Sequence, residues 1–518
     1  MLTRRSWINR TLSSALLPGS GLCHAQNTNQ AGARTAAGRN GLFTPDIEIS
    51  LVARIGKAEI WKGQKTSVYQ FRGKVVKGRK GALRKSGSFL GPTLDLIRGE
   101  RVRIHFENQI NEPTIVHWHG MIVQESADGH PQFAVKPGGK YTYEFEVTNR
   151  AGTYWYHPHP HGRTGVQVYY GLAGALIVRD PAENGTGIPS GDDEHLLIIQ
   201  DRRADQQNQF QYISNMMDRM MGVLGDRMLI NGKADSTTLV SRKPNRLRLL
   251  NLSNARSYKL AWSDGSPMHV ISTDGGLLNR NEGPRTVPFV FLAPAQRIDL
   301  WEDFSTRQAG SKVTLVSKPF SLPMGMSMGP GRGQNRMPRG MGPGMMGGVG
   351  QKINVANFKI ANEKAVGGRL PSLPYRSKKL PAASRNILTR IGFRMMRGFL
   401  NGKQWDMKNM THVDQEEILK LNQPVIWTFD NASEPGMSMA HPIHLHGVQF
   451  RIVERKGNGA PDLAQGVIDT GDHDTVMVFA GETVKIHVTP TEPGLFVYHC
   501  HNLEHEDAGM MRNFLVTE

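Results

Sequence analysis

Ten of the 19 histidines in this 518-residue chain fall in four short motifs, which lie toward the two ends of the sequence. In chain order these motifs are His117-Trp-His119, His157-Pro-His159, His441-Pro-Ile-His444-Leu-His446, and His499-Cys500-His501 with His505 nearby. Four such motifs in one chain are hard to explain as solvated strand faces, and imidazoles are common metal ligands. If the motifs bind shared metal ions, the two ends of the chain must fold against each other.

The motif nearest the C-terminus can serve two metal sites. Side chains alternate faces along a strand, so His499 and His501 point one way and Cys500 the other. A cysteine, two histidines and a weak axial methionine form a blue-copper centre. Cys500, His505 and Met510 supply three of these ligands. The candidate for the fourth is His441, because the same alternation puts the other two histidines of its motif together on another face.

Counting the remaining histidines predicts a second copper site. Eight imidazoles suit three copper ions that keep positions open for a small ligand; they are His117, His119, His157, His159, His444, His446, His499 and His501. Each end of the chain supplies half of this set. By contrast, His105 and His487 occupy the polar phase of alternating strands, and we expect both to face solvent.

Alternating apolar and polar residues predict an all-β chain. Segments such as 47–53, 141–147 and 483–488 read as half-buried strands between Gly, Pro, Asn and Asp turns. The length suggests about three to four domains. Linker-like stretches at 181–193 and 371–381 divide the chain into three blocks.

The N-terminus resembles an export signal. Residues 1–25 combine the paired Arg4 and Arg5, a weakly apolar run and a plausible cleavage site near Ala25. Paired arginines indicate the twin-arginine route of bacteria, so we expect a periplasmic protein. Residues 26–43 are polar and Gly-rich and predict a flexible leader. The alternative is a disordered basic N-terminus without a targeting role.

The cysteine content argues against a disulfide-bonded protein, and the distribution of charge argues against a nucleic-acid-binding protein. Cleavage would remove Cys23 and leave Cys500 alone, so no disulfide is expected within the mature chain. The net charge of +18 can indicate nucleic-acid binding, but the basic residues are scattered apart from a run at 72–80, which we interpret as a solvated hairpin. No apolar run reaches the roughly 18 residues of a membrane span. We therefore expect a monomer without nucleic acid or a membrane span.

Methionines gather in two places. Residues 321–350 contain seven methionines and ten glycines without hydrophobic periodicity, which predicts a mobile loop. Thioethers select Cu(I), so copper capture and a plain linker both remain open. Met216, Met217, Met220 and Met221 form two i,i+4 pairs on an expected short helix, and their ordinary interpretation is core packing.

The motifs resemble those of the multicopper oxidases along nearly all of the chain after the export signal. The similarity is strongest to the bacterial periplasmic copper-efflux (cuprous) oxidases, with laccase-like features. Flanking residues agree at 153–159, 254–257, 274–278 and 505–510. The resemblance implies three cupredoxin-like Greek-key β-sandwich domains. These would span 44–182, 190–368 with a Met/Gly-rich loop at 321–350, and 383–518.

The resemblance also implies a role for each copper ligand. Type 1 copper would be held by His441, Cys500, His505 and Met510; type 2 by His117 and His444; and the type 3 pair by His119, His157 and His501 on one ion and His159, His446 and His499 on the other. Asp128 and Glu506 match acidic positions that deliver protons in the family. From the sequence alone, each is an ordinary surface carboxylate.

By this resemblance, the chain is an oxidase with four copper ions. Substrate would reduce the type 1 copper, electrons would pass through Cys500 to His499 and His501, and dioxygen would become water. The expected substrates are Cu(I), phenolic compounds or both, with a role in copper homeostasis and tolerance. Possible substrate-copper ligands are Met324, Met326, Met328 and Met439.

Two features depart from the copper-efflux pattern. The Met-rich run falls near the end of the second domain instead of the start of the third, and Met437 replaces an expected aspartate. One alternative is therefore a laccase-like phenol oxidase without a copper-handling role. Another is a copper-free cupredoxin scaffold, which the intact ligand set disfavours. A copper nitrite reductase would not need a second histidine pair at every motif.

Overall fold

The structure is a computed structural model that describes residues 34–35, 43–322, 324–327, 335–336, 350–395, 397–434, 436–457 and 459–518. The described chain is built of β-strands with a few short helices, so the predicted all-β class is confirmed. None of the described helices combines the length and the apolar character needed to cross a lipid bilayer. The proposed export signal and most of the leader lie outside the described residues.

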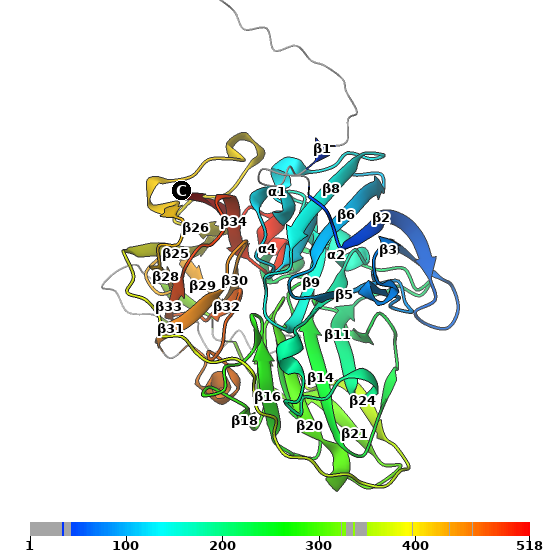
Figure 1. Cartoon of the computed structure of the whole chain (residues 1–518). Coiled ribbons are helices and arrows are strands. Elements are labelled where there is room, and N and C mark those ends of the chain that lie inside the picture. The colour runs from blue at the N-terminus through cyan, green and yellow to red at the C-terminus, as the bar shows by residue number, and fades with distance from the viewer. Residues whose placement is uncertain are drawn as a thin grey trace, which may run out of the picture. The chain divides into compact units, whose positions relative to one another are not determined.

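The first block forms two five-stranded sheets (Figure 1). The first sheet has the order β1 (Arg34–Thr35), β8 (Lys140–Glu146), β6 (Arg101–Gln109), β2 (Ile47–Ala58) and β3 (Thr66–Lys77). The second has the order β4 (Leu83–Arg84), β5 (Thr93–Ile97), β10 (Gly174–Arg179), β9 (Gly152–Pro158) and β7 (Val116–His119). Buried residues of both sheets form one hydrophobic core, as in a β-sandwich.

The second block repeats this plan with longer sheets. One sheet runs β12 (Arg227–Ile230), β11 (Glu194–Arg202), β14 (Pro244–Asn251), β20 (Arg297–Asp303), β16 (Met268–Thr273) and β17 (Gly276–Leu277), with β18 (Arg285–Val287) also paired to β16. The other runs β13 (Thr237–Val240), β24 (Ile353–Ile360), β21 (Lys312–Ser317), β15 (Tyr258–Trp262) and β19 (Val290–Leu292). These sheets enclose a core of their own.

The third block is again a pair of five-stranded sheets. One runs β26 (Arg397–Leu400), β25 (Asn386–Arg394), β28 (Val425–Asp430), β33 (Thr483–Val488) and β31 (Phe450–Lys456). The other runs β27 (Ile418–Lys420), β35 (Met511–Thr517), β34 (Gly494–Cys500), β30 (His441–Leu445) and β32 (Thr475–Val478). A small extra sheet joins β23 (Asn335–Arg336) and β22 (Gly325–Ser327) of the Met-rich segment to β29 (Gly436–Ser438).

The described residues contain four short α-helices, each between strands of one block: α1 (Glu125–Asp128), α2 (Thr164–Tyr170), α3 (Met216–Met221) and α4 (Leu503–Asp507). In Figure 1, α4 lies where strands of the first block (blue to cyan) meet those of the last (orange to red), and it contacts α2 and α3. The ends of the chain therefore fold against each other, as the histidine count required. Apart from β1 and the small extra sheet, which joins segments of the second and third blocks, the strands of each sheet lie within one of the three predicted domains. The boundaries of these domains remain a prediction.

Candidate metal centres

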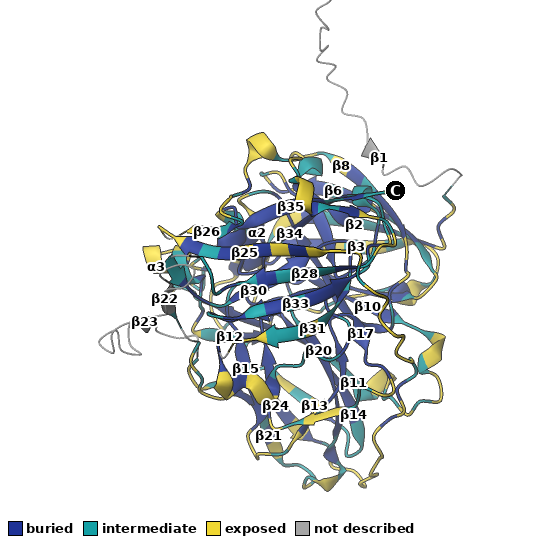
Figure 2. Cartoon of the chain, turned by 90° about the vertical axis from the view of Figure 1, so that its left-hand side faces the viewer, coloured by how far each residue is buried: buried dark blue, intermediate teal, exposed yellow. Residues whose placement is uncertain are grey.

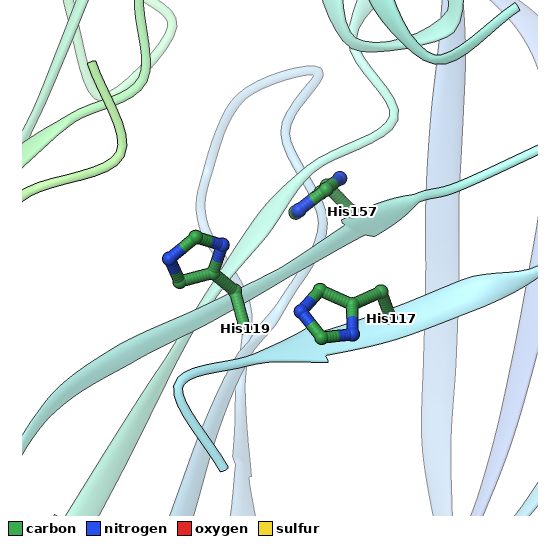
Figure 3. A group of neighbouring side chains, drawn as sticks. All are labelled: His117, His119 and His157. Carbon is green, nitrogen blue, oxygen red and sulfur yellow. The ribbon is translucent and has the colours of Figure 1, made fainter. Parts of the chain in front are cut away.

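The first two histidine motifs lie on paired strands. In β7 and β9, His117 is the direct partner of His157 in an antiparallel register, and His119 lies two residues farther along β7. Figure 3 shows the three rings on the same side of the two strands. One ring nitrogen from each of these histidines lies within 4.8 Å of the others.

The last two motifs repeat this arrangement in the third block. His444 on β30 is paired with His499 on β34, and Ile443 with Cys500. Strand alternation then sends His499 and Cys500 to opposite faces of the sheet. The two faces of β34 thus present two groups of candidate ligands, one with His499 and one with Cys500.

The eight predicted histidines come together between the first and third blocks, and all are buried. His117 Nε2 of the first block lies 3.3 Å from His444 Nε2 of the third block, so imidazoles of the two blocks are in direct contact. His499 Nε2 lies 3.3 Å from His159 Nε2 and 3.1 Å from His446 Nε2. The ring of His501 has its centre 5.0 Å from that of His119 and 5.4 Å from that of His157.

Hydrogen bonds at the far side of most rings fix which nitrogen faces the centre. The Nδ1 atoms of His117, His157 and His444 contact backbone carbonyl oxygens at 2.7, 2.9 and 2.8 Å. His446 Nδ1 instead contacts Asp128 Oδ2 at 2.7 Å. Carbonyl and carboxylate oxygens only accept hydrogen bonds, so Nδ1 carries the proton and Nε2 keeps a lone pair for a metal.

His119 is oriented the other way round. Its Nε2 lies 3.0 Å from Asp474 Oδ1, while its Nδ1 has no hydrogen-bond partner among the described residues. Asp474 in turn binds the Arg297 guanidinium, and both side chains are fully buried. Burial acts to raise the pKa of the Asp474 carboxyl, but the Arg297 charge outweighs it and holds this pKa well below its usual value. Neither residue was anticipated from the sequence, because neither belongs to a recognisable motif.

Burial keeps several of these imidazoles in the neutral form that binds metal. It lowers the pKa of His444 to about 4 and the pKa of His157 and His501 well below the usual value. A neutral imidazole has the free lone pair that a copper ligand needs. Buried nitrogens without a partner are costly, and His157 Nε2 and both nitrogens of His501 have none among the described residues. The histidine set therefore fits bound copper.

A separate group surrounds Cys500. His441 Nδ1 and His505 Nδ1 lie 3.4 and 3.6 Å from Cys500 Sγ. The Cys500 N–H donates to the carbonyl of Met510 at 3.0 Å, which anchors that residue beside the cysteine. Burial raises the pKa of the Cys500 thiol, so a metal must displace its proton on binding. A cysteine, two histidines and a methionine are the donor types of a blue-copper centre.

The second and third blocks cover this group. His505 Nε2 donates to the Met220 carbonyl of α3 at 2.8 Å. The ring of Phe393 on β25 lies 5.2 Å from His505 and 6.2 Å from His441. Gly398 on β26 packs so closely that a Cβ there would overlap the Met510 thioether. Neither Phe393 nor the α3 carbonyl was anticipated from the sequence.

Three interpretations from the sequence are corrected. Asp128 and Glu506 are not surface carboxylates but are buried against the histidines. His487 does not face solvent; it is 6% exposed and donates to the Pro381 carbonyl. The predicted short helix α3 is confirmed, but Met216 and Met217 are 63% and 43% exposed and do not pack in a core. The ribbon of α3 in Figure 2 is accordingly coloured yellow and teal.

The expected substrate-copper methionines are only partly described. Met439 is buried two residues before His441, and Met324 is half-buried. Met326 lies in β22, where its backbone is paired with Met437 of β29, whereas Met328 lies outside the described residues. The described part of the Met-rich segment therefore adds a strand beside the residues that precede His441.

Known proteins resemble the chain along nearly its whole length. Multicopper oxidase family models match residues 73–183 and 380–518. A multicopper oxidase of Staphylococcus haemolyticus is 30% identical over 93% of this chain and 94% of that protein. A laccase of Bacillus subtilis is 27% identical, covering 84% and 90% of the two chains.

A solved structure agrees with these sequence matches. The McoA multicopper oxidase of Aquifex aeolicus superposes with a TM-score of 0.75 at 30% identity, over 92% of this chain and 97% of that one. The likeness extends across all three sandwiches and therefore supports the cupredoxin-like fold. The chain belongs to the multicopper oxidase family, whose members are oxygen-dependent oxidoreductases with four copper ions.

Proposed function

We propose that this enzyme oxidises its substrate one electron at a time at a type 1 copper and reduces dioxygen to water at a trinuclear copper cluster. The observation that carries the proposal is the end of strand β34, which contributes His499 to one candidate ligand group and Cys500 to the other. Bound copper would supply the one-electron acceptance and the four-electron reduction of dioxygen. The protein would supply a short covalent path between the two sites.

The distances given above support a ligand assignment. We assign His441, Cys500, His505 and Met510 to type 1 copper; His117 and His444 to type 2; His119, His157 and His501 to one type 3 ion; and His159, His446 and His499 to the other. Ligand atoms of the trio His159, His446 and His499 lie within 4.8 Å of one another, as do those of His441, Cys500 and His505.

We further propose that Asp128 and Glu506 hold and transfer protons at the histidine cluster. Asp128 Oδ2 accepts from His446 Nδ1, and its Oδ1 has no hydrogen-bond partner among the described residues, so it can take a proton. Glu506 Oε2 lies 3.1 Å from His499 Nδ1 on another side of the cluster. Both carboxylates are excluded from bulk water, so protons must reach the cluster through fixed groups of this kind.

The reducing substrate that we favour is Cu(I), with phenolic compounds as further substrates and a role in copper tolerance. The pairing of β22 with β29 brings the Met-rich segment to the residues just before His441, and thioethers select Cu(I). The exposed methionines of α3 lie on the helix whose carbonyl binds His505. We also keep the proposals of export by the twin-arginine route, a periplasmic location and a monomer.

The second candidate is a laccase-like phenol oxidase in which the Met-rich segment has no copper role. Phe393 is 2% exposed and shields the proposed type 1 histidines. A bulky phenol would then donate its electron through this cover without touching the metal. The relative named as a laccase keeps this alternative open.

Two measurements test these proposals. The copper-loaded protein should show an intense band near about 600 nm from the copper–thiolate bond, and a protein that binds copper without this band would refute the type 1 assignment. A variant with the seven methionines of 321–350 replaced by leucine keeps the length of the segment. It should lose Cu(I) oxidation while phenol oxidation persists; unchanged Cu(I) turnover would favour the laccase-like alternative.

A further inference from the structure

One arginine of the second block connects all three blocks at the histidine cluster. Arg297 begins β20, and its Nε donates to the Thr153 carbonyl on β9 at 2.9 Å. The strand β9 also carries His157. The two Nη atoms of the same guanidinium form a bidentate ion pair with Asp474, in which Arg297 Nη1 lies 2.9 Å from Asp474 Oδ1. Asp474 directly precedes β32, which is paired with the histidine-bearing strand β30.

The Arg297–Asp474 ion pair contacts His119, the histidine whose Nε2 points away from the cluster. Asp474 Oδ1 contacts His119 Nε2 at 3.0 Å, so the proton of His119 sits on Nε2 and its Nδ1 faces the cluster. The hydroxyl of Thr475 also donates to Asp474 Oδ1 at 2.8 Å. The residue after His119 is Gly120, where a Cβ would collide with both Asp474 and Arg297. The chain therefore leaves space for this pair beside the ligand.

We propose that Arg297 and Asp474 are positioning residues through which the second block, which supplies none of the assigned ligands, sets the ring orientation and proton position of His119. The inference rests on the proposed trinuclear site. Arg297 has a planar fork that holds Asp474 in one orientation. Asp474 then presents one fixed acceptor to His119, in the way that partners of ligating histidines set their tautomer.

A neighbouring arginine provides a matched control for a merely structural role. Like Arg297, Arg248 is fully buried and belongs to the second block. Its Nη1 donates to the hydroxyl oxygen of Thr153 at 3.0 Å. It forms a buried ion pair with Asp299 at 2.9 Å. In the part of the chain that the structure describes, neither Arg248 nor Asp299 forms a hydrogen bond with a histidine of the cluster. Loss of Arg248 should therefore disturb packing between the blocks without acting on His119.

The test compares copper-loaded wild type with Arg297→Met, Asp474→Asn and the control Arg248→Met. Each protein is titrated with a copper chelator while the blue band reports type 1 copper and electron paramagnetic resonance reports type 2 copper. Metal analysis gives the copper content per chain, and the melting temperature is recorded in parallel. Asp474→Asn keeps the side-chain shape but offers an amide, which can favour the opposite tautomer of His119.

Arg297→Met and Asp474→Asn should lose cluster copper at about 10- to 100-fold lower chelator strength than wild type, the range for partners of metal-ligating histidines. Their blue band should persist, and Arg248→Met should lose cluster copper only at the chelator strength that wild type requires, whatever its melting temperature. The proposal is overturned if the Arg297 and Asp474 variants retain cluster copper as Arg248→Met does, or if both copper signals fall together with the melting temperature. If Arg297→Met does not fold, the copper retention of Asp474→Asn decides between these two outcomes. A wild type without cluster copper would instead refute the proposed function.

Discussion

The axial position of the proposed type 1 site gives a sharp prediction. Met510 is fully buried in the core around Cys500, and we assign its thioether as the weak fourth ligand. Met510→Leu removes the sulfur and keeps nearly the same volume, so it should cost less than about 1.5 kcal/mol of stability. The change therefore tests electronic structure without unfolding the site.

The expected effect is a rise in the reduction potential of type 1 copper. A thioether donates electron density and stabilises the oxidised ion more than the reduced ion, so its removal favours reduction. For a one-electron couple, a preference of about 1.4 kcal/mol corresponds to about 59 mV. We therefore expect an increase of about 60 mV or more, with copper content unchanged, because His441, Cys500 and His505 remain.

Spectroelectrochemical titration of the blue band measures this potential directly. The matched control is Met511→Leu, since Met511 is equally buried but packs with Trp405 and Val497 in a different cluster. The control should leave the potential where it is in the wild type. A Met510→Leu potential no higher than that of Met511→Leu would show that Met510 is not an axial ligand.

Three further predictions concern the same fold. Gly398→Ala should displace the Met510 thioether and change the blue band without loss of type 2 copper; an unchanged spectrum would contradict the proposed packing. Burial raises the pKa of Glu302 to about 8, so the native state holds a proton that the unfolded chain releases near pH 4. Stability should fall as pH rises from about 4.5 to 8, by up to about 1.4 kcal/mol per unit. Glu302→Gln should flatten this dependence in melting curves at pH 5.5 and 8, and an equal slope in both proteins would refute it. Removal of copper should lower the melting temperature, reversibly on its return, because the ions bind the folded state; a melting temperature indifferent to chelator would contradict this.

The sequence alone determined the fold class and the chemistry of the centre. Period-two patterns on segments such as 47–53 and 483–488 predicted strands that the structure contains as β2 and β33. The H-x-H spacing placed His499 and His501 on one face of a strand and Cys500 on the other, and this follows from backbone geometry alone. Ligand counting then required the two ends of the chain to meet, because neither end holds enough histidines for the cluster.

Only the tertiary structure identified the groups that orient those ligands. Asp474 and Arg297 lie far from His119 in sequence, and only the docking of the three blocks brings them within hydrogen-bond distance. The structure also corrected the interpretation of Asp128, which was expected at the surface but is buried against His446. Ligand identity is encoded by local spacing, which the sequence displays. Ring orientation depends on contacts between segments hundreds of residues apart, and these exist only once the chain has folded.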